Sequence, residues 1–266
     1  QDQEDASNQD QKDVSNQDHN DASNNDIYDD HFYINRENEI YEKGIFYKLN
    51  KTRKTADIYF PDSNIINIHV PRSIVFKSTE YLVTNIVKCN ETLHFTHSIT
   101  FSDDSEIKCI DTSNFNTTNK KICITIPSGV EKIIQARNYA LIDIVISPTN
   151  KNFKWLDDKV LLGKSNVNSD DFDVIVYAHQ NITEITIPSN IKHIYPYCFY
   201  NNQNLRSATF SDNSELPSIG QYAFESTSIE TITIPPHVTE IGEYAFCCCQ
   251  KLRVTFSDNS KLLSVG

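Results

Sequence analysis

The segment IETITIPPHVTEIGEYAFCCCQK, residues 229–251, decides the fold of this 266-residue chain because it is one copy of a repeat. The other copies are NITEITIPSNIKHIYPYCFYNNQN (181–204), LRSATFSDNSELPSIGQYAFESTS (205–228) and LRVTFSDNSKLLSVG (252–266). The apolar anchors Ile187, Phe210, Ile234 and Phe256 follow one another at steps of 23, 24 and 22 residues. Such a period predicts a solenoid, in which each unit buries its apolar face against its neighbours.

Each copy alternates apolar and polar residues over four positions, which predicts one half-buried strand per copy. Stacked in parallel, the strands place these apolar residues inside: Ile185, Ile187, Ala208, Phe210, Ile232, Ile234, Val254 and Phe256. The residues predicted to face outward are Glu184, Thr186, Ser207, Thr209, Thr231, Thr233, Arg253 and Thr255. A proline or the tetrapeptide Ser-Asp-Asn-Ser then ends each strand with a turn.

The segment I-G-x-x-A-F follows the strand and its turn in two of the copies. It is too short for a long helix and predicts a short helical or 3-10 turn on the opposite wall of the solenoid. The residues expected to point inward from this wall are Ile219, Phe224, Ile241 and Phe246.

Three regions are expected along the chain. Residues 1–31 hold three acidic octapeptide copies and carry a charge of −9 out of −12, so we expect a disordered tail, either a spacer or drifted low-complexity sequence. Residues 32–97 are expected to form a degenerate opening unit, and residues 98–266 the solenoid with an inserted hairpin at about 144–180. The remaining charge of −3 gives no strong field for nucleic acid or a membrane surface, so neither is expected as a partner.

The end of the sequence falls within a copy of the repeat. Ser264-Val265-Gly266 matches Ser218-Ile219-Gly220, after which the expected Tyr-Ala-Phe is missing. We therefore expect the solenoid to stop in mid-repeat. Either further residues follow Gly266 or the last strand is exposed, and an exposed last strand would favour self-association at the C-terminal edge.

The repeat resembles the leucine-rich repeat of microbial BspA-like surface antigens, L-x-x-I-x-I-P-x-x-V-x-x-I-G-x-x-A-F-x-x-C. The matching residues are Ile232, Ile234, Pro235, Val238, Ile241, Gly242, Ala245, Phe246 and Cys249. Residues 144–166 are similar to the inserted hairpin of that family, and residues 44–86 to its opening unit. The resemblance implies a right-handed leucine-rich-repeat coil with a parallel sheet on one face.

The resemblance also implies a location and a role. It implies a cell-surface or extracellular protein that binds host matrix or cell-surface proteins, with cell adhesion as the usual proposal. The alternative is an intracellular scaffold that assembles partner proteins, and a cytoplasmic location stays open. Free thiols and unused glycosylation sequons at Asn50, Asn90, Asn116 and Asn181 would favour the scaffold.

Three consecutive cysteines, Cys247, Cys248 and Cys249, stand behind the repeat phenylalanine. Equivalent positions in other copies hold Tyr200, Asn201 and Asn202, or Glu225, Ser226 and Thr227, so we expect a largely solvated loop. Three consecutive residues do not easily aim three thiolates at one ion, and no metal site is expected. Cys249 is expected to be a buried thiol, whereas Cys247 and Cys248 are expected to be exposed, oxidisable and able to crosslink two chains.

No enzymatic motif is present in the sequence. His94 and His97 lack a third ligand, the Ser-Asp turns lack a calcium-binding ladder, and there is no nucleophile elbow or phosphate-binding glycine loop. We therefore expect no catalytic residues and no cofactor. The eight outward residues of the strands form a candidate binding face, although β-propensity on an exposed pleat explains them equally well and no aromatic anchor marks a hot spot.

Overall fold

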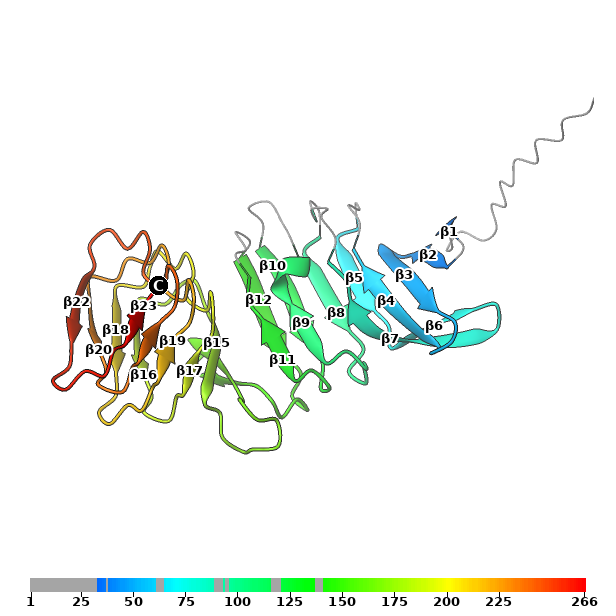
Figure 1. Cartoon of the computed structure of the whole chain (residues 1–266). Helices are drawn as coiled ribbons and strands as arrows, with labels where there is room; N and C mark the ends of the chain where they lie inside the picture. The colour runs from blue at the N-terminus through cyan, green and yellow to red at the C-terminus, as the bar shows by residue number, and fades with distance from the viewer. Residues whose placement is uncertain are drawn as a thin grey trace, which may run out of the picture. The chain divides into compact units, whose positions relative to one another are not determined.

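The computed structural model describes residues 33–36, 38–60, 65–88, 93, 96–115, 121–136 and 141–266. The tail predicted at 1–31, Cys89 and His94 lie outside these residues. The described chain consists of strands and turns, with one 3-10 turn, η1 (Thr112–Asn114) (Figure 1). No helix in this described part is long and apolar enough to cross a bilayer.

The first sheet is built mainly from hairpins. Its order is β1 (Tyr33–Arg36), β2 (Glu39–Glu42), β3 (Ile45–Asn50), β4 (Thr55–Tyr59), β7 (Thr79–Ile86) and β6 (Ser73–Phe76). All neighbours are antiparallel except β4 and β7, which run parallel. Alternation in β3 buries Ile45, Tyr47 and Leu49 on one face, as a strand packed on one side requires.

Parallel coils begin beside this sheet. The strands β5 (Asn67–Val70), β8 (Ser98–Phe101), β10 (Lys121–Ile126) and β12 (Leu141–Ile146) form one parallel sheet, and β9 (Cys109–Asp111) pairs with β11 (Lys132–Ile134) in another. Strand β5 pairs with β8 at four positions, from Asn67↔Ser98 to Val70↔Phe101. The boundary expected at residues 97 and 98 stays a prediction, with paired strands on both sides of it.

The predicted inserted hairpin is present, while its bounds of about 144–180 stay a prediction. Strands β13 (Lys154–Leu156) and β14 (Val160–Gly163) are antiparallel, and β14 pairs with β15 (Val174–Ala178). Three residues connect these strands, and the first two, Asp157 and Asp158, both have a φ of 51° within a turn that the N–H of Lys159 closes on Leu156 O at 2.9 Å. Aspartate tolerates this left-handed conformation better than most residues, so Asp-Asp replaces the commoner Asp-Gly.

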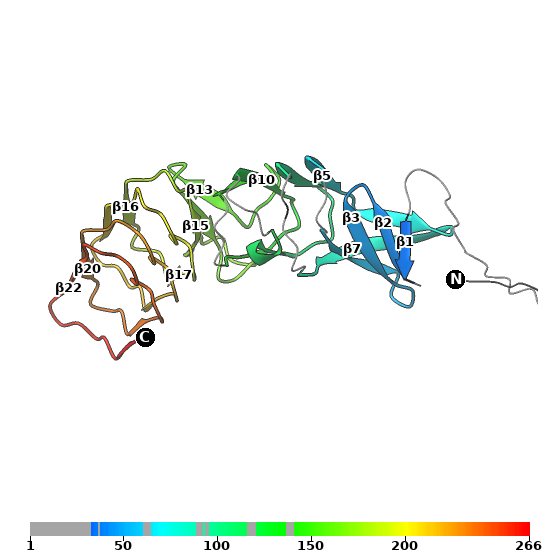
Figure 2. The ribbon, with the colours of Figure 1, turned by 90° about the horizontal axis from the view of Figure 1, so that it is seen from above.

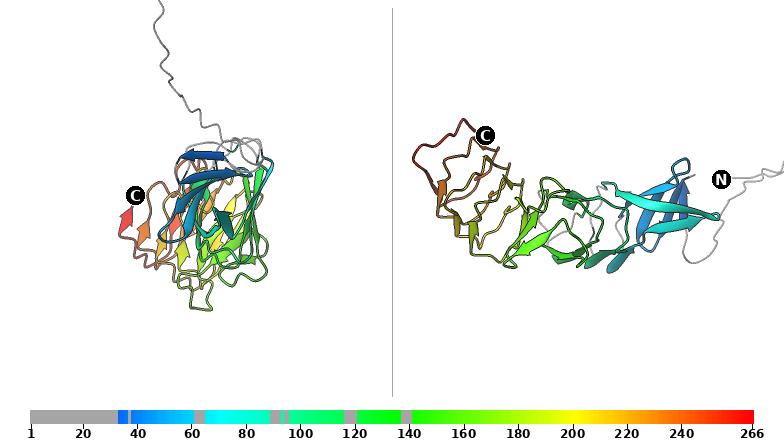
Figure 3. Two further views of the ribbon diagram at one scale, coloured as in Figure 1. Left: turned by 90° about the vertical axis from the view of Figure 1, so that its right-hand side faces the viewer. Right: turned by 90° about the horizontal axis from the view of Figure 1, so that it is seen from below.

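The last coils form a leucine-rich-repeat solenoid with a parallel sheet on one wall, as predicted, and a second row of parallel strands on the facing wall (Figure 2). One wall contains β16 (Glu184–Ile187), β18 (Ser207–Phe210), β20 (Thr231–Ile234) and β22 (Arg253–Phe256). The other continues from β15 through β17 (His193–Ile194), β19 (Ser218–Ile219), β21 (Glu240–Ile241) and β23 (Ser264–Val265). Figure 3 shows these coils following one another along the chain from yellow to red.

The opposite wall differs in detail from the prediction of helical or 3-10 turns. Two-residue strands followed by turns stand there instead. The reason is a left-handed residue in three of the copies, Tyr197, Tyr222 or Tyr244, with φ values of 61°, 56° and 55°. A left-handed residue interrupts a right-handed helical path, so the segment turns rather than winding into a helix.

The interior of these coils is a column of aromatic and aliphatic side chains. Phe199 stacks on Phe224 with ring centroids 4.7 Å apart, and Phe224 on Phe246 at 5.4 Å. Ile219, Phe224 and Ile241 are buried, as predicted, while Phe246 is half-buried. Val254 and Phe256, predicted to be inside, are 39% and 50% exposed because no described strand lies beyond β22 to cover them.

Candidate binding face

The eight residues predicted to face outward lie on one surface of the sheet β16-β18-β20-β22, which we call the outward column. They are Glu184, Thr186, Ser207, Thr209, Thr231, Thr233, Arg253 and Thr255. All are exposed except Ser207, which is half-buried. Hydroxyl groups of neighbouring strands bond along the column, Thr186 with Thr209 at 3.1 Å and Thr233 with Thr255 at 2.8 Å.

The strands that carry the outward column are not evenly paired. We call each pair of neighbouring strands in a sheet a step. Strands β16 and β18 pair at four positions, as do β20 and β22, whereas β18 and β20 pair only at Ser207↔Thr231. In the two paired steps, the residue after the later strand closes the ladder: Ser211 N–H donates to Ile187 O at 2.9 Å, and Ser257 N–H to Ile234 O at 3.0 Å. Pro235 holds this place after β20 and has no N–H to donate to Phe210 O. The sheet therefore opens between β18 and β20.

The earlier parallel sheet follows the same rule. Strands β5 and β8 pair at four positions and β10 and β12 at six, and the residues that follow, Ser102 and Ser147, donate their N–H groups to Val70 O and Ile126 O. Strands β8 and β10 pair at only two positions, and the residue after β10 is Pro127. Two neighbouring strands therefore pair over more positions when the residue that follows the later strand has an N–H to donate than when that residue is proline.

The open step between β8 and β10 is bridged by a side chain. Asp103 accepts the N–H of Ser128 at 3.2 Å and the hydroxyl of Thr149 at 2.9 Å. Hydrogen bonds from the side chains of Ser147 and Thr149, together with the Ser128 N–H, lower the pKa of Asp103. The equivalent of Ser128 after β20 is Pro236, which has no N–H, so the step between β18 and β20 lacks this bridge.

A groove of about 520 Å³ lies where β18 and β20 diverge. Its residues from the outward column are Thr209, Thr231 and Thr233. Pro235 and Pro236 supply apolar surface, while Asp212 and His237 supply a carboxylate and an imidazole. Its volume falls in the range of ligand sites, and its mixture of hydroxyls with apolar surface suits the backbone and small side chains of an extended polypeptide.

A column of tyrosines lies on the turns of the opposite wall and was missed in the sequence. Tyr197 stacks on Tyr222 at 4.8 Å, and Tyr222 on Tyr244 at 5.1 Å. Tyr244 is 54% exposed at the end of the column. The available signal was a tyrosine two residues before the core phenylalanine in three copies, and tyrosine is a common hot-spot residue at protein interfaces.

The cysteine loop is less solvated than predicted, so that expectation is wrong. In the copies that precede it, Asn202, Glu225 and Thr227 are all buried. Two of them form hydrogen bonds inside: the Asn202 amide donates to His179 O at 2.8 Å, and the Thr227 hydroxyl lies 3.2 Å from the Cys249 sulfur. A polar composition therefore did not mean a solvated loop.

The three cysteines differ in their surroundings. Cys248 is exposed, as predicted, whereas Cys247 and Cys249 are half-buried. The Cys249 thiol donates to Phe224 O at 3.1 Å. The Cys247 and Cys248 sulfurs lie 3.4 Å apart, and the hydrogen bond to Cys248, some burial and nearby negative charge raise the pKa of Cys247.

The C-terminal part of the chain, which contains the repeat copies, matches a known family. Residues 171–265 match the family described as BspA type Leucine rich repeat region, in six copies. Leucine-rich-repeat regions typically bind proteins and are generally non-catalytic. A search of curated proteins found no match.

Several solved structures are similar to the chain. One is a leucine-rich repeat protein from Eubacterium ventriosum, with 19% identity over 81% of this chain and 70% of that chain and a TM-score of 0.46. A leucine rich cell surface protein from Faecalibacterium prausnitzii has 15% identity over 86% and 98%, with a TM-score of 0.29. The pneumococcal vaccine antigen PcpA has 16% identity over 83% and 82%, with a TM-score of 0.35.

Proposed function

We propose that this protein, whose residues 171–265 are a BspA-type leucine-rich-repeat region, is a non-enzymatic binding module of a cell-surface antigen. It presents the outward column of β16-β18-β20-β22 to a protein ligand, in adhesion or in recognition of a host matrix or cell-surface protein. The observation that carries the proposal is the groove between β18 and β20, which opens within an otherwise regular row of exposed hydroxyls.

A protein ligand suits this face better than a small molecule or a polyanion. The threonine hydroxyls both donate and accept hydrogen bonds, as peptide groups do, and they stand on a scaffold fixed by the stacked interior. The column carries one acid, Glu184, and one base, Arg253, at opposite ends of its row. It therefore offers no field that would select nucleic acid.

The proposed location is the cell surface. Its support is similarity to a cell surface protein and to a vaccine antigen among the solved structures, together with the family of the repeat. The location is tested by labelling intact cells with a membrane-impermeant reagent. Labelling of the protein only after lysis would overturn it.

The binding face is tested with purified extracellular-matrix proteins immobilised for surface plasmon resonance. The variant Thr209→Arg with Thr233→Arg fills the groove and is expected to weaken binding of a captured matrix protein by at least about tenfold, the loss expected from removing one well-packed contact region. The matched control replaces His193 and Glu240 on the opposite wall and should bind as the wild type does. Binding that survives the groove variant would overturn the choice of face.

An intracellular scaffold that assembles partner proteins is the second candidate. The observation that favours it is that all six described cysteines are free thiols. Mass spectrometry of the native protein separates the two: glycans at the sequons support surface display, while unmodified asparagines and reduced cysteines support the scaffold.

A further inference from the structure

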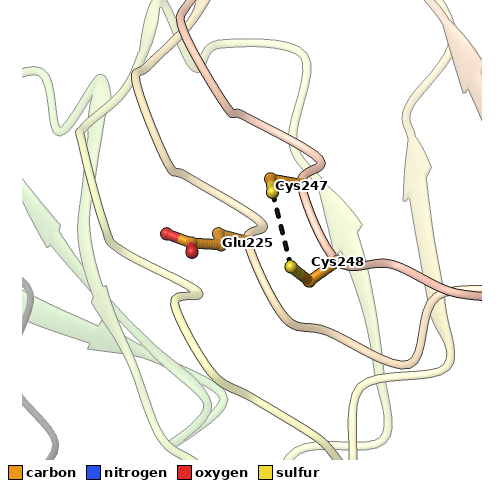
Figure 4. Close-up of side chains that lie close together, drawn as sticks. All are labelled: Glu225, Cys247 and Cys248. Atoms are coloured by element: carbon orange, nitrogen blue, oxygen red, sulfur yellow. Dashed lines mark hydrogen bonds between the residues drawn. The ribbon is translucent and has the colours of Figure 1, made fainter.

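Three side chains with ligand atoms for a metal ion meet at the turn after the core phenylalanines. Glu225 comes from one coil, and Cys247 and Cys248 come from the next (Figure 4). Their carboxylate and sulfur atoms all lie within 4.8 Å of one another. The two sulfurs are 3.4 Å apart and lie on the side of their segment that faces the Glu225 segment.

The backbone explains why these residues meet. Glu225 and Cys247 hold equivalent positions in consecutive copies, each directly after a core phenylalanine. Two hydrogen bonds of 2.8 Å fix the turns against each other, from Phe224 N–H to Ala245 O and from Ser226 N–H to Cys247 O. Cys248 has a φ of 60°, and this left-handed conformation turns its side chain back toward that of Cys247.

We propose that Cys247, Cys248 and Glu225 bind one thiophilic divalent cation such as Zn²⁺. Thiolate and carboxylate together are a donor set used by zinc, whereas calcium and magnesium prefer oxygen alone. With zinc–sulfur distances of about 2.3 Å, tetrahedral geometry places two sulfurs about 3.8 Å apart, close to the 3.4 Å observed here. A water molecule completes the four ligands.

The carboxylate is the ligand that has to move. Tetrahedral zinc holds a carboxylate oxygen about 3.6 Å from each sulfur, so the oxygen of Glu225 must approach by up to about 1 Å from the 4.8 Å limit. Figure 4 shows the Glu225 carboxylate directed away from the two sulfurs, so binding of the ion requires Glu225 to adopt another side-chain rotamer that turns the carboxylate toward them. Cys248 also lines a groove of about 540 Å³ with Ser226 and Lys251, which gives the ion a path from solvent.

Cys249 is not a ligand in this arrangement. Its thiol is bonded to Phe224 O at 3.1 Å and lies 3.2 Å from the hydroxyl of Thr227. No metal site is expected from the sequence alone, because three consecutive cysteines do not easily aim three thiolates at one ion. The proposed site departs from that expectation because its third ligand comes from the neighbouring coil. A bound ion would tie the copy 205–228 to the copy 229–251 and stabilise the fold by binding only its native form.

The test is titration of the reduced full chain with Cd²⁺, which reports thiolate ligation by a charge-transfer absorption in the ultraviolet. We expect a saturable band that disappears in C247S and in C248S and that Zn²⁺ displaces. E225Q should weaken the affinity by at least about tenfold, the size of one lost ligand contact. C249S is the matched control, because a serine hydroxyl can donate the same bond to Phe224 O, and it should keep the band.

Thermal unfolding gives a second measurement that does not depend on the absorption band. Zn²⁺ should raise the Tm of the wild type and of C249S and leave that of C247S unchanged. Three results would overturn the proposal: no difference in the band between the wild type and C247S, full affinity in E225Q, or loss of the band in C249S. Circular dichroism of each variant checks that the fold is retained, so a missing band reports a missing ligand.

Discussion

The step from β16 to β18 and the step from β18 to β20 lie side by side in one sheet, yet the first pairs at four positions and the second at one. The sequences of the strands do not explain this, since all alternate in the same way. The difference is the residue outside the strand, Ser211 in the first step and Pro235 in the second. The absence of one N–H, at Pro235, thus explains why the sheet is continuous in the first step and opens into a groove in the second.

The opening is confined to one wall of the solenoid. On the opposite wall, β19 and β21 keep their pairing at Ser218↔Glu240 and Ile219↔Ile241. Between the walls, the phenylalanine column continues across the open step, although the centroid distance rises from 4.7 Å to 5.4 Å. A solenoid can therefore vary its surface at one step while its interior stays continuous, which is how a repeat scaffold acquires a local site.

The largest expected effect tests this continuity of the interior. Phe224 is fully buried between Phe199 and Phe246, so Phe224→Ala should cost about 3–5 kcal/mol of unfolding free energy, as large-to-small changes in a core do. Thr231→Ala, on the exposed side of β20, should change it by less than about 0.5 kcal/mol. Urea unfolding measures both. A cost below about 1 kcal/mol for Phe224→Ala would mean that the interior is open at this step as well.

The next effect concerns β22 and β23, the last strands of their two sheets. Each pairs with the strand before it, and no described strand lies on its other edge. Phe256, Leu263 and Val265 are 50%, 85% and 66% exposed there. For a chain produced with Gly266 as its last residue, we expect two copies to associate through this edge, as unpaired apolar edges do. Phe256→Glu should weaken the association by at least about tenfold, given about 1.5–3 kcal/mol for burying such a side chain.

Sedimentation velocity over a range of concentrations measures this association. Val75→Glu is the matched control, because Val75 is 59% exposed on β6, away from this edge. A monodisperse monomer at high concentration would contradict the prediction, and equal weakening by both variants would show that the edge is not the contact.

A smaller effect tests the proline rule directly. Pro235→Ser restores an N–H opposite Phe210 O, and one added backbone hydrogen bond is worth about 0.5–1.5 kcal/mol. Protection of the amides of β20 against hydrogen exchange should therefore rise by up to about tenfold. Pro188→Ser is the matched control, because β16 begins its sheet and no strand precedes it. Equal changes in the two variants would show that the missing N–H is not what opens the step.

The sequence alone predicted the parts of this fold that depend on short periods. Alternation placed Thr186, Thr209 and Thr233 outward, because side-chain direction in a strand depends only on parity. It did not reveal the groove, because the effect of Pro235 depends on a carbonyl 25 residues earlier in the chain, at Phe210. The tyrosine turns were missed because tyrosine rarely adopts a positive φ.

The candidate metal site was missed for a related reason. The cysteines were compared with the equivalent positions of other copies, among them Glu225, which was interpreted as a solvated position and not as a neighbour of Cys247 and Cys248 in space. The sheet β1-β2-β3-β4-β7-β6 lacked any repeat to compare with, so its hairpins could not be placed beforehand. Short-range patterns in the sequence predicted which way the side chains point. The candidate sites depend on contacts between neighbouring coils, which these patterns do not contain.

The smallest expected effect compares the bridged open step with the unbridged one as the pH changes. Asp103 spans the step between β8 and β10, and its bonds with Ser147, Thr149 and Ser128 lower its pKa in the folded protein. A lowered folded pKa stabilises the fold at pH values above the ordinary aspartate pKa of about 3.9, and this contribution is lost as the pH falls through the folded value. Asp103→Asn keeps an acceptor oxygen but does not titrate.

The Tm of the wild type should therefore exceed that of Asp103→Asn by a small, constant amount above about pH 5, and the difference should shrink as the pH falls below about 4. Asp212→Asn is the matched control at the step between β18 and β20. Because Pro236 offers no N–H there, this variant removes no bond to a backbone N–H across its step, and at neutral pH it should lower the Tm by less than Asp103→Asn does. An equal loss of Tm in both variants would mean that Asp212 bridges its step by another contact, and the comparison between the two open steps would fail.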